Sequence, residues 1–550
     1  MQKIEKDPTE ILYRKQVVSF KWENEDFHVY WEGLVFINGI LSGKESIERF
    51  MRELKTKSIK DACSLLKGIY FISVKDKTSG DICAFVDNSG LYQAFYTKKS
   101  ISTSFLELVK NENCQVHHLD QEAIVEFLYF GTLFFNKTFF KSISRIPRDK
   151  ILHLRRQGGK INMLQKNIPA INEPFENASK SIQDIFGGIA HSLSNLNISI
   201  DLTGGTDTRL IALILDYYGL KFETAVSGGA ETYPDVFISE KVAKAISHPW
   251  YSTIHTINAL EKEIPELFNA TEGLYNILSI HRLLQLQKDR LTRGIDTIIS
   301  GVGGEFFKDF WWLQDFPLYS SRSANIKRFV DMRIMSFKPM QFIFSDKVVE
   351  ASQTLRKNII QKLLPYRLET NTKTYDNIGF NFTMREVAGR ELANYSSYLK
   401  TYAPLLDLDI VRIGFNLPRN QRIFNAYLRK ELTILNPLIA KIPTTEGGIS
   451  VSSEPLMIIQ DLPKYAIEKI DRILIKLNLK KRKRFNELNC PNFYHHVRKM
   501  EIMRKSLSIL KDVEIINHKI ELENFEDRLL GMILSLGMLV NYLNNKEKST

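Results

Sequence analysis

The chain has 550 residues, of which 44% are hydrophobic and 25% charged, and this length excludes a single compact core. The formal net charge is +12 at pH 7, but the 63 acidic residues are spread throughout the sequence. The basic run KKRKR at 480–484 has no aromatic residues interleaved with it. We therefore expect a solvated helix end or loop there and no nucleic acid partner. A milder interpretation of the charge is attraction of an acidic substrate or a nucleotide.

The cysteines and the apolar stretches indicate the cellular compartment of the protein. The four cysteines are Cys63, Cys83, Cys114 and Cys490. They are too few for a disulfide framework, and no CxxC pair or Cys/His cluster indicates zinc. The first twenty residues lack the apolar region of a secretory signal, and the most apolar stretch, 529–543, is shorter than the ~20 residues that span a bilayer. We expect a cytoplasmic protein without a membrane span and a packed C-terminal helix.

Residues 16–165 have the short alternating runs that are typical of a hairpin-rich β domain. The runs are VVSFKW, HVYWEGLVFING, GIYFISVKD, DICAFVDN and QAFYTKK, separated by turn residues. From 155 to 176 the sequence loses its periodicity and gathers Gly, Asn and Pro. We place a domain boundary in this segment, which divides the chain into domains at 1–165 and 166–550.

After the boundary, apolar strands alternate with longer amphipathic helices, a pattern that is typical of a doubly wound parallel sheet. The predicted strands are ISIDL, FETAVSG, WYSTIHTI and, last, DTIISG. The predicted helices that follow the first three strands cover about 208–218, 235–246 and 275–291. From about residue 320 onward the pattern is mostly helical.

The loop TGGTDT at 203–208 joins a predicted strand to a predicted helix and has the features of an anion site. Its two glycines let backbone N–H groups turn toward a ligand, and the helix presents its positive N-terminal end. Asp207 would repel a bare phosphate, so its position indicates a divalent cation between carboxylate and phosphate. The loop is neither a Walker A motif nor a GxGxxG turn. A glycine-rich turn that serves only close packing is the alternative.

TGGTDTR resembles the SGGxDS pyrophosphate-binding loop of the N-type ATP pyrophosphatases, and the wider chain resembles the asparagine synthetase family. The other stretches similar to that family occur in the family's order, at 65–96, 127–152, 300–307 (SGVGGEFF) and 401–423. The resemblance implies an α+β glutaminase-like (Ntn-type) sandwich that is followed by an α/β doubly wound parallel-sheet synthetase domain with a helical C-terminal part. The first domain would be a class II glutamine amidotransferase-like domain.

The resemblance also implies an AMP-forming ligase that depends on ATP and Mg²⁺. A substrate carboxylate would attack the α-phosphorus of ATP to give an acyl-adenylate and pyrophosphate, and an amine would then displace AMP to form an amide. The residues implied in binding ATP and pyrophosphate are Thr203, Gly204, Gly205, Thr206, Asp207, Thr208, Gly301, Gly303 and Gly304.

The remaining site residues follow from the same resemblance. Asp207 and Glu305 would hold Mg²⁺, which neutralises charge on the phosphates. The family usually has Asp at the second position, so we expect a shifted or water-bridged ion. Leu202 and Val226 would lie against the adenine. Lys441, in AKIPTTEGGIS, would be the catalytic lysine near the α-phosphate, and a surface lysine is the alternative.

The N-terminal domain departs from the family's pattern. Class II amidotransferases use a cysteine that becomes residue 1 after removal of Met, with its own amine as the base. This chain begins Met-Gln-Lys-Ile, and its first cysteine, Cys63, lies in a predicted buried helix. We therefore expect a glutaminase fold without its nucleophile, kept as a scaffold or as a substrate-recognition surface.

Val302 is the second departure. At this position asparagine synthetases have glutamate and β-lactam synthetases have a tyrosine implicated in activating the amine. Valine accepts no proton, so the base lies elsewhere, the amine arrives uncharged, or the second half-reaction is impaired. The function we favour is glutamine-independent amide formation on a small-molecule or peptide carboxylate, as in β-lactam and lasso-peptide macrolactam formation. The alternatives are an asparagine synthetase and a catalytically impaired nucleotide-binding scaffold, and a homodimer or a pathway partner protein stays open.

Three further residues have two interpretations each. Glu272 and Tyr275 precede a helix that should line the cleft, although Glu272 is otherwise an acid that complements a helix dipole. His248 lies in a helix-to-strand turn, where a hydrogen-bonded structural histidine is the expected role.

We predict that the protein does not hydrolyse glutamine, because no cysteine can become residue 1. The purified protein, incubated with glutamine, should release no more glutamate than a heat-inactivated sample. Release well above that control would contradict the loss of the glutaminase nucleophile.

Overall fold

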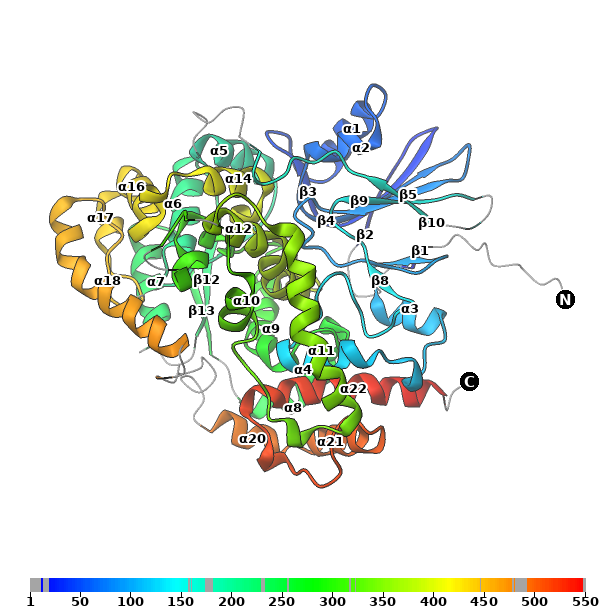
Figure 1. Cartoon of the computed structure of the whole chain (residues 1–550). Coiled ribbons are helices and arrows are strands. Elements are labelled where there is room, and N and C mark those ends of the chain that lie inside the picture. Colours follow the sequence, from blue (N-terminus) through cyan, green and yellow to red (C-terminus); the bar gives the residue numbers. More distant parts are fainter. Residues whose placement is uncertain are drawn as a thin grey trace.

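The computed structural model describes residues 11–12, 19–156, 159, 161–173, 182–228, 233–254, 257–315, 318–321, 323–445, 447–476, 479 and 492–547. The protein is a mixed α/β protein, with antiparallel sheets in the N-terminal part and a parallel sheet later in the chain (Figure 1). Over these residues, no helix has both the length and the apolar character needed to cross a membrane. Cys490 and the basic run 480–484 lie outside the described residues.

The N-terminal part contains two sheets. The six-stranded antiparallel sheet has the order β10-β9-β5-β4-β3-β2. Its strands are β2 (Ser19–Glu23), β3 (Phe27–Ile37), β4 (Leu66–Asp76), β5 (Ile82–Val86), β9 (Lys150–Leu154) and β10 (Ile161–Gln165). The four-stranded sheet has the order β1-β7-β6-β8, with β1 (Ile11–Leu12), β6 (Phe95–Tyr96), β7 (Ile101–Ser102) and β8 (Ser144–Arg145).

Alternation along the long strands divides the N-terminal core in two. On β3, Trp31 and Val35 belong to a core shared with the helix α1 (Lys44–Glu53). Leu34 and Phe36 face the other way, into a larger core that continues through the rest of the protein. The remaining N-terminal helices are α2 (Ile59–Ala62), α3 (Phe105–Asn111) and α4 (Gln121–Phe130).

Several strands were not predicted from the sequence, and two of them show why. β10 lies within 155–176, the segment we expected to be irregular, and it pairs with β9 as a mostly exposed edge strand, so its apolar signal is weak. The second is β15 (Lys400–Tyr402), which extends the parallel sheet beyond the strand we expected to be its last. Three residues are too few to show a period in the sequence.

The parallel sheet has the order β13-β12-β11-β14-β15, and every neighbouring pair is parallel. Its other strands are β11 (Ile198–Asp201), β12 (Glu223–Gly228), β13 (Trp250–Ile254) and β14 (Thr297–Ile299). The helices α6 (Asp207–Tyr217), α7 (Pro234–Ala245) and α9 (Ile277–Thr292) lie close to the predicted ranges, whereas α8 (Ile257–Thr271) was not predicted. The chain runs from β11 outward to β13 and returns to β14 on the other side of β11. Right-handed crossovers therefore put α6 and α7 on one face and α8 and α9 on the other.

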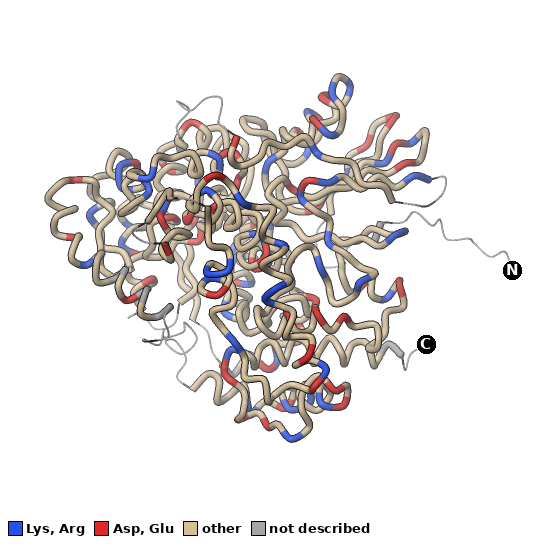
Figure 2. The backbone as a smooth tube through the Cα atoms, in the orientation of Figure 1, with Lys and Arg blue, Asp and Glu red and all other residues tan. Residues whose placement is uncertain are grey.

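Helices form most of the remaining chain. They are α5 (Ile182–Leu193), α10 (Ile326–Phe329), α11 (Asp346–Leu363), α12 (Asn371–Ile378), α13 (Gly389–Tyr395), α14 (Leu408–Asn416), α15 (Arg419–Arg422), α16 (Ala426–Leu435), α17 (Pro437–Lys441), α18 (Pro455–Lys476), α20 (Phe493–Lys499), α21 (Glu501–Asp512) and α22 (Asp527–Glu547). The apolar stretch 529–543 lies in α22, whose leucines are buried against neighbouring helices, as we predicted. Figure 2 shows Lys and Arg interspersed with Asp and Glu over the described backbone.

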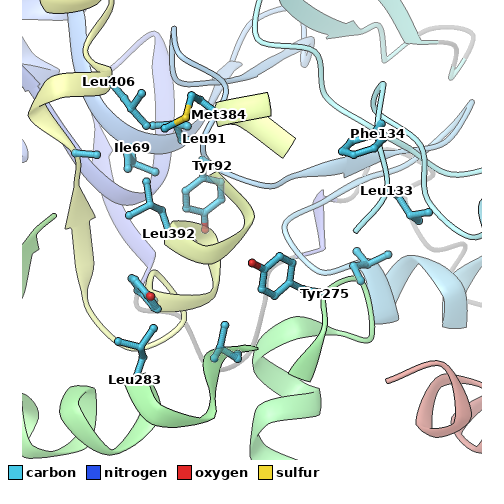
Figure 3. Close-up of a cluster of buried hydrophobic side chains, with 14 of the residues drawn as sticks. Ile69, Leu91, Tyr92, Leu133, Phe134, Tyr275, Leu283, Met384, Leu392 and Leu406 are labelled. Carbon is cyan, nitrogen blue, oxygen red and sulfur yellow. The ribbon is translucent and has the colours of Figure 1, made fainter. Parts of the chain in front are cut away.

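The N-terminal sheets and the later helices share a continuous buried interface. Leu91, Tyr92 and Leu133 belong to the same buried apolar cluster as Leu392 and Leu406 (Figure 3). The division of the chain at 165/166 stays a prediction. The chain just beyond it is anchored to the first part, because the Lys166 side chain is buried and donates to the carbonyl of Val86.

Ion pairs and a helix cap reinforce this interface. Lys67 on β4 donates to Asp407 at 2.8 Å and to Asp409 at 2.6 Å. Burial alone would lower the pKa of this lysine, but the two carboxylates outweigh it and raise the pKa. Glu272 accepts from the Phe105 N–H at 2.9 Å and from the Ser104 hydroxyl, so it caps α3 from the other side of the interface.

Glu386 is a deeply buried acid of this interface. It pairs with Arg145 from β8, and Arg390 lies 3.9 Å from the same carboxylate oxygen. Burial would raise the pKa of Glu386, but the charges of Arg145, Arg385 and Arg390 outweigh that effect and lower it. The carboxylate is therefore ionised and compensates buried guanidinium groups.

We predict that Glu386→Ala destabilises the protein by about 3–5 kcal/mol, because it leaves buried guanidinium groups without their counter-charge. Glu369→Ala is the matched control, since the pair of Glu369 with Lys373 is exposed, and it should cost less than ~1 kcal/mol. Denaturant unfolding of the three proteins measures both effects. Equal midpoints for the two variants would contradict the prediction.

Candidate functional site

A cavity of about 810 Å³ opens at the carboxyl ends of β11, β12 and β14. This is where the strand order reverses direction, and ligands of open parallel sheets commonly bind at such a point. Both predicted loops reach it. The lining residues from these loops are Thr203, Gly205, Thr206, Asp207, Thr208, Ser300, Gly301, Val302 and Glu305.

The first loop is closed by its own threonines. The Thr203 N–H donates to the Thr208 hydroxyl at 3.2 Å, and the Gly205 N–H donates to the Thr203 hydroxyl at 3.2 Å. Thr206 then precedes the first turn of α6, so the N-terminal end of this helix lies at the cavity wall. The helix end carries partial positive charge, but the N–H groups of Gly204 and Gly205 both donate within the protein, so the anion site stays a prediction.

Gly204 is not among the residues that line the cavity. Its N–H donates to the Asp235 carboxylate at 2.8 Å, and its carbonyl accepts from the Thr445 N–H at 3.2 Å. A Cβ at Gly204 would come within 2.5 Å of the Thr445 methyl group, so a larger residue would have to displace the Thr445 side chain. Asp235, on α7, was missed by the sequence analysis, although an acid in the first turn of a helix next to a proline was a visible signal.

The second loop meets the first through a carboxylate packed on a glycine. A Cβ at Gly304 would lie 2.0 Å from the Asp207 carboxyl carbon, so the absence of a side chain lets the two loops touch. Gly303 precedes the 3₁₀ turn Gly304–Phe307, and neither glycine lines the cavity, whereas Gly301 does. The structure therefore brings Asp207 and the loop of Glu305 together, as we expected.

Lys308 also reaches this point and was not predicted. Its ammonium lies 2.8 Å from the Asp207 carboxylate. The Glu305 side chain lies nearby and is partly exposed. Desolvation raises its pKa, the charge of Asp207 raises it further, and Lys308 partly offsets both effects. The junction of the two loops thus contains two carboxylates and one ammonium group.

The two carboxylates suit a magnesium–nucleotide complex. The buried Oε2 of Glu305 has no hydrogen-bond partner among the described residues, and such an oxygen is a ready ligand. Within the described chain no group of three or more His, Cys, Asp or Glu is arranged for a metal ion. Mg²⁺ in nucleotide sites takes one or two carboxylates together with phosphate oxygens and water, so Asp207 and Glu305 suffice.

The remaining predicted site residues lie at different depths. Val226 lines the cavity with its neighbours Ala225 and Ser227, whereas Leu202 is fully buried and is not part of the lining. Lys441 is not part of the lining either. It is half exposed and pairs with Glu454 at 2.9 Å.

The wall formed by α9 and α13 adds residues that the sequence analysis did not single out. Arg282, Glu391 and Tyr395 line the cavity there. The Tyr395 hydroxyl donates to the Glu391 carboxylate. Burial raises the pKa of Tyr395 well above its usual range and Glu391 adds to the rise, so the tyrosine stays a proton donor. The four-residue spacing of the pair on one helix was a signal in the sequence.

The residues for which the sequence allowed a structural interpretation have structural surroundings in the fold. His248 contacts the Phe222 carbonyl at 3.0 Å and Asp216 at 2.9 Å, which is the structural role we expected. Tyr275 is buried outside the cavity lining, and Glu272 caps α3 as described above. Cys63 is buried, and desolvation raises the pKa of its thiol to about 12, which leaves it unreactive.

Neither a scan against protein-family models nor a search of the curated proteins gave a match. The function is therefore inferred from the cavity and its residues.

We predict that Glu305→Ala weakens Mg²⁺-dependent ATP binding by about 10–100-fold, because it removes one of two carboxylate ligands. Glu305→Asp should keep the Mg²⁺ dependence, since it keeps a carboxylate at the position. Glu240→Ala, on the exposed pair with Lys244, is the control and should bind as the wild type. Calorimetric ATP titrations with and without Mg²⁺ measure all four proteins. Equal Mg²⁺ dependence in wild type and Glu305→Ala would refute the two-loop metal site.

Proposed function

We propose that the chain is an ATP- and Mg²⁺-dependent, AMP-forming ligase that adenylates a carboxylate and transfers the acyl group to an amine. The observation that carries this proposal is the contact of Asp207 with the loop of Glu305 at the reversal point of the parallel sheet. The proposal includes the finer fold, namely a doubly wound synthetase domain behind a glutaminase-like sandwich, and membership of the asparagine synthetase family. The TGGTDT and SGVGGEFF loops support that membership by their order and place.

Different cavity residues would bind different parts of the Mg²⁺–ATP complex in the first step, the adenylation of the carboxylate. The N-terminal turn of α6 and the hydroxyls of Thr203 and Thr208 would bind the pyrophosphate portion of ATP. Val226 and Ala225 would contact the adenine. Asp207 and Glu305 would hold Mg²⁺, which supplies charge neutralisation on the phosphates. Lys308, which pairs with Asp207, would add a further positive charge beside that carboxylate.

The second step needs a proton acceptor for the amine, and Glu391 is the acid we infer for it. Asp201 is paired at 2.7 Å with the buried Arg290, and Asp235 holds the Gly204 N–H. Asp207 and Glu305 belong to the metal position. Glu391 lies in the same cavity with Tyr395 as its donor, which orients one carboxylate oxygen and leaves the group able to accept a proton.

A nucleotide-binding protein without ligase activity is the second candidate. Val302 lines the cavity where other family members carry a proton-transfer group, and Lys308 already compensates the charge of Asp207. Such a protein would bind ATP but would not exchange its pyrophosphate.

We predict ATP–pyrophosphate exchange that depends on Mg²⁺ and on one carboxylate from a screened panel. Asp207→Asn should abolish the exchange because an amide is a poor, uncharged metal ligand. Glu391→Gln should keep the exchange and lower amide formation by about 10²–10⁴-fold, the usual contribution of a general base. ATP binding without exchange on any carboxylate would favour the second candidate, and loss of exchange in Glu391→Gln would remove its assignment to the second step.

A further inference from the structure

We propose that Lys308 keeps free Mg²⁺ away from Asp207 and Glu305 and admits the ion only together with a nucleotide. This role rests on the proposed function, because it concerns the same metal position. It would make the binding of the metal conditional on the binding of ATP.

The ammonium group of Lys308 already supplies positive charge at the junction of the two loops. It lies 2.8 Å from both carboxylate oxygens of Asp207. Its charge also acts on Glu305, where it lowers the pKa of the carboxyl against the larger effects of burial and of Asp207. A metal ion that binds Asp207 must therefore take the place of this ammonium group, because both need the same oxygens.

The backbone of Lys308 is anchored, so only its side chain can move. Its carbonyl accepts from Arg422 Nε at 3.1 Å and from Nη2 at 2.8 Å. Arg422 is buried, pairs with Asp376 and lies over the Trp312 ring. The Lys308 side chain itself is only 12% exposed. An anchored, largely buried lysine differs from a surface lysine that meets an acid by chance, and its ammonium stays near the loops when it releases Asp207.

Glu305 provides an oxygen ligand that Lys308 does not satisfy. Its buried Oε2 has no hydrogen-bond partner among the described residues. With Lys308 in place, the junction contains two carboxylates and one ammonium group, which leaves a single net negative charge when both acids are ionised. Such a junction is a weak site for free Mg²⁺, because this ion gives up its water reluctantly.

A nucleotide changes this balance. Its phosphates supply further oxygen ligands for the ion, and their negative charge gives the Lys308 ammonium a partner other than Asp207. Without phosphate, release of Asp207 would leave a largely buried ammonium group without its counter-charge, which is costly. Lys308 thereby couples the binding of the metal to the binding of the nucleotide.

Binding of Mn²⁺ without nucleotide tests this role. Mn²⁺ takes the same oxygen ligands as Mg²⁺, and electron paramagnetic resonance measures its free concentration. The wild type should bind Mn²⁺ weakly, and Lys308→Met should bind it about tenfold more tightly, because the two carboxylates lose their internal cation. Lys308→Arg keeps the charge and should behave as the wild type. In the double variant Lys308→Met with Glu305→Ala the gain should disappear, which would locate it at the junction.

Lys244→Met is the matched control, because Lys244 pairs with Glu240 at an exposed position, and it should bind Mn²⁺ as the wild type. Unchanged circular dichroism spectra would show that the variants are folded. Equal Mn²⁺ binding by the wild type and a folded Lys308→Met would overturn the proposal. Tight Mn²⁺ binding by the wild type without nucleotide would overturn it whether or not the variants fold.

A calorimetric titration of the wild type with ATP and Mg²⁺ separates these outcomes from a failure of the proposed function. If the wild type binds ATP with Mg²⁺ and Lys308→Met gains no Mn²⁺ binding, only the role of Lys308 is refuted. If the wild type does not bind ATP with Mg²⁺, the proposed function is refuted, and the coupling through Lys308 is refuted with it.

Discussion

The close contact between Asp207 and Gly304 is the constraint on which the site depends. The two residues follow neighbouring parallel strands. Any side chain on the α-carbon of Gly304 would have to displace the Asp207 carboxylate. This contact fixes the separation of the two loops and places the Asp207 carboxylate where its charge acts on Glu305. It also sets the direction of α6, since Asp207 is the first residue of that helix.

The charges of the cavity form a balanced set around that contact. Lys308 compensates Asp207, Arg290 compensates Asp201, and Asp235 is bound to the backbone of the first loop. Desolvation raises the pKa of Glu305, and the charge of Asp207 adds to the rise. A divalent ion bound with phosphate would change this balance, since it would bring positive charge to Glu305 and compete with Lys308 for Asp207. The metal position and the lysine are thus electrostatically coupled.

The sequence was informative where the signal for a structural feature lay within one short segment of the chain. The loop 203–208 and the loop 300–307 each follow a short apolar strand, and the residue types alone indicate an anion and a cation. The strands β10 and β15 were missed because one is an exposed edge and the other has only three residues. Lys308, Asp235 and Glu391 were missed because their roles depend on elements that meet only in the folded chain. Lys441, in contrast, was predicted from a matching sequence position, but its side chain pairs with Glu454 and does not line the cavity.

The interface between the N-terminal sheets and the later helices has a consequence for how the chain is made. The partners of its early residues, Asp407 for Lys67 and Glu386 for Arg145, are encoded far downstream. A ribosome that adds about 5–20 residues per second needs roughly 10–50 seconds to pass from the end of β10 to Asp407. During that interval the face of β4 that will pack on β15 is exposed on the nascent chain. The first sheets therefore cannot complete their packing until the downstream residues of the interface have been synthesised. A chaperone that shields apolar strands would act during this interval.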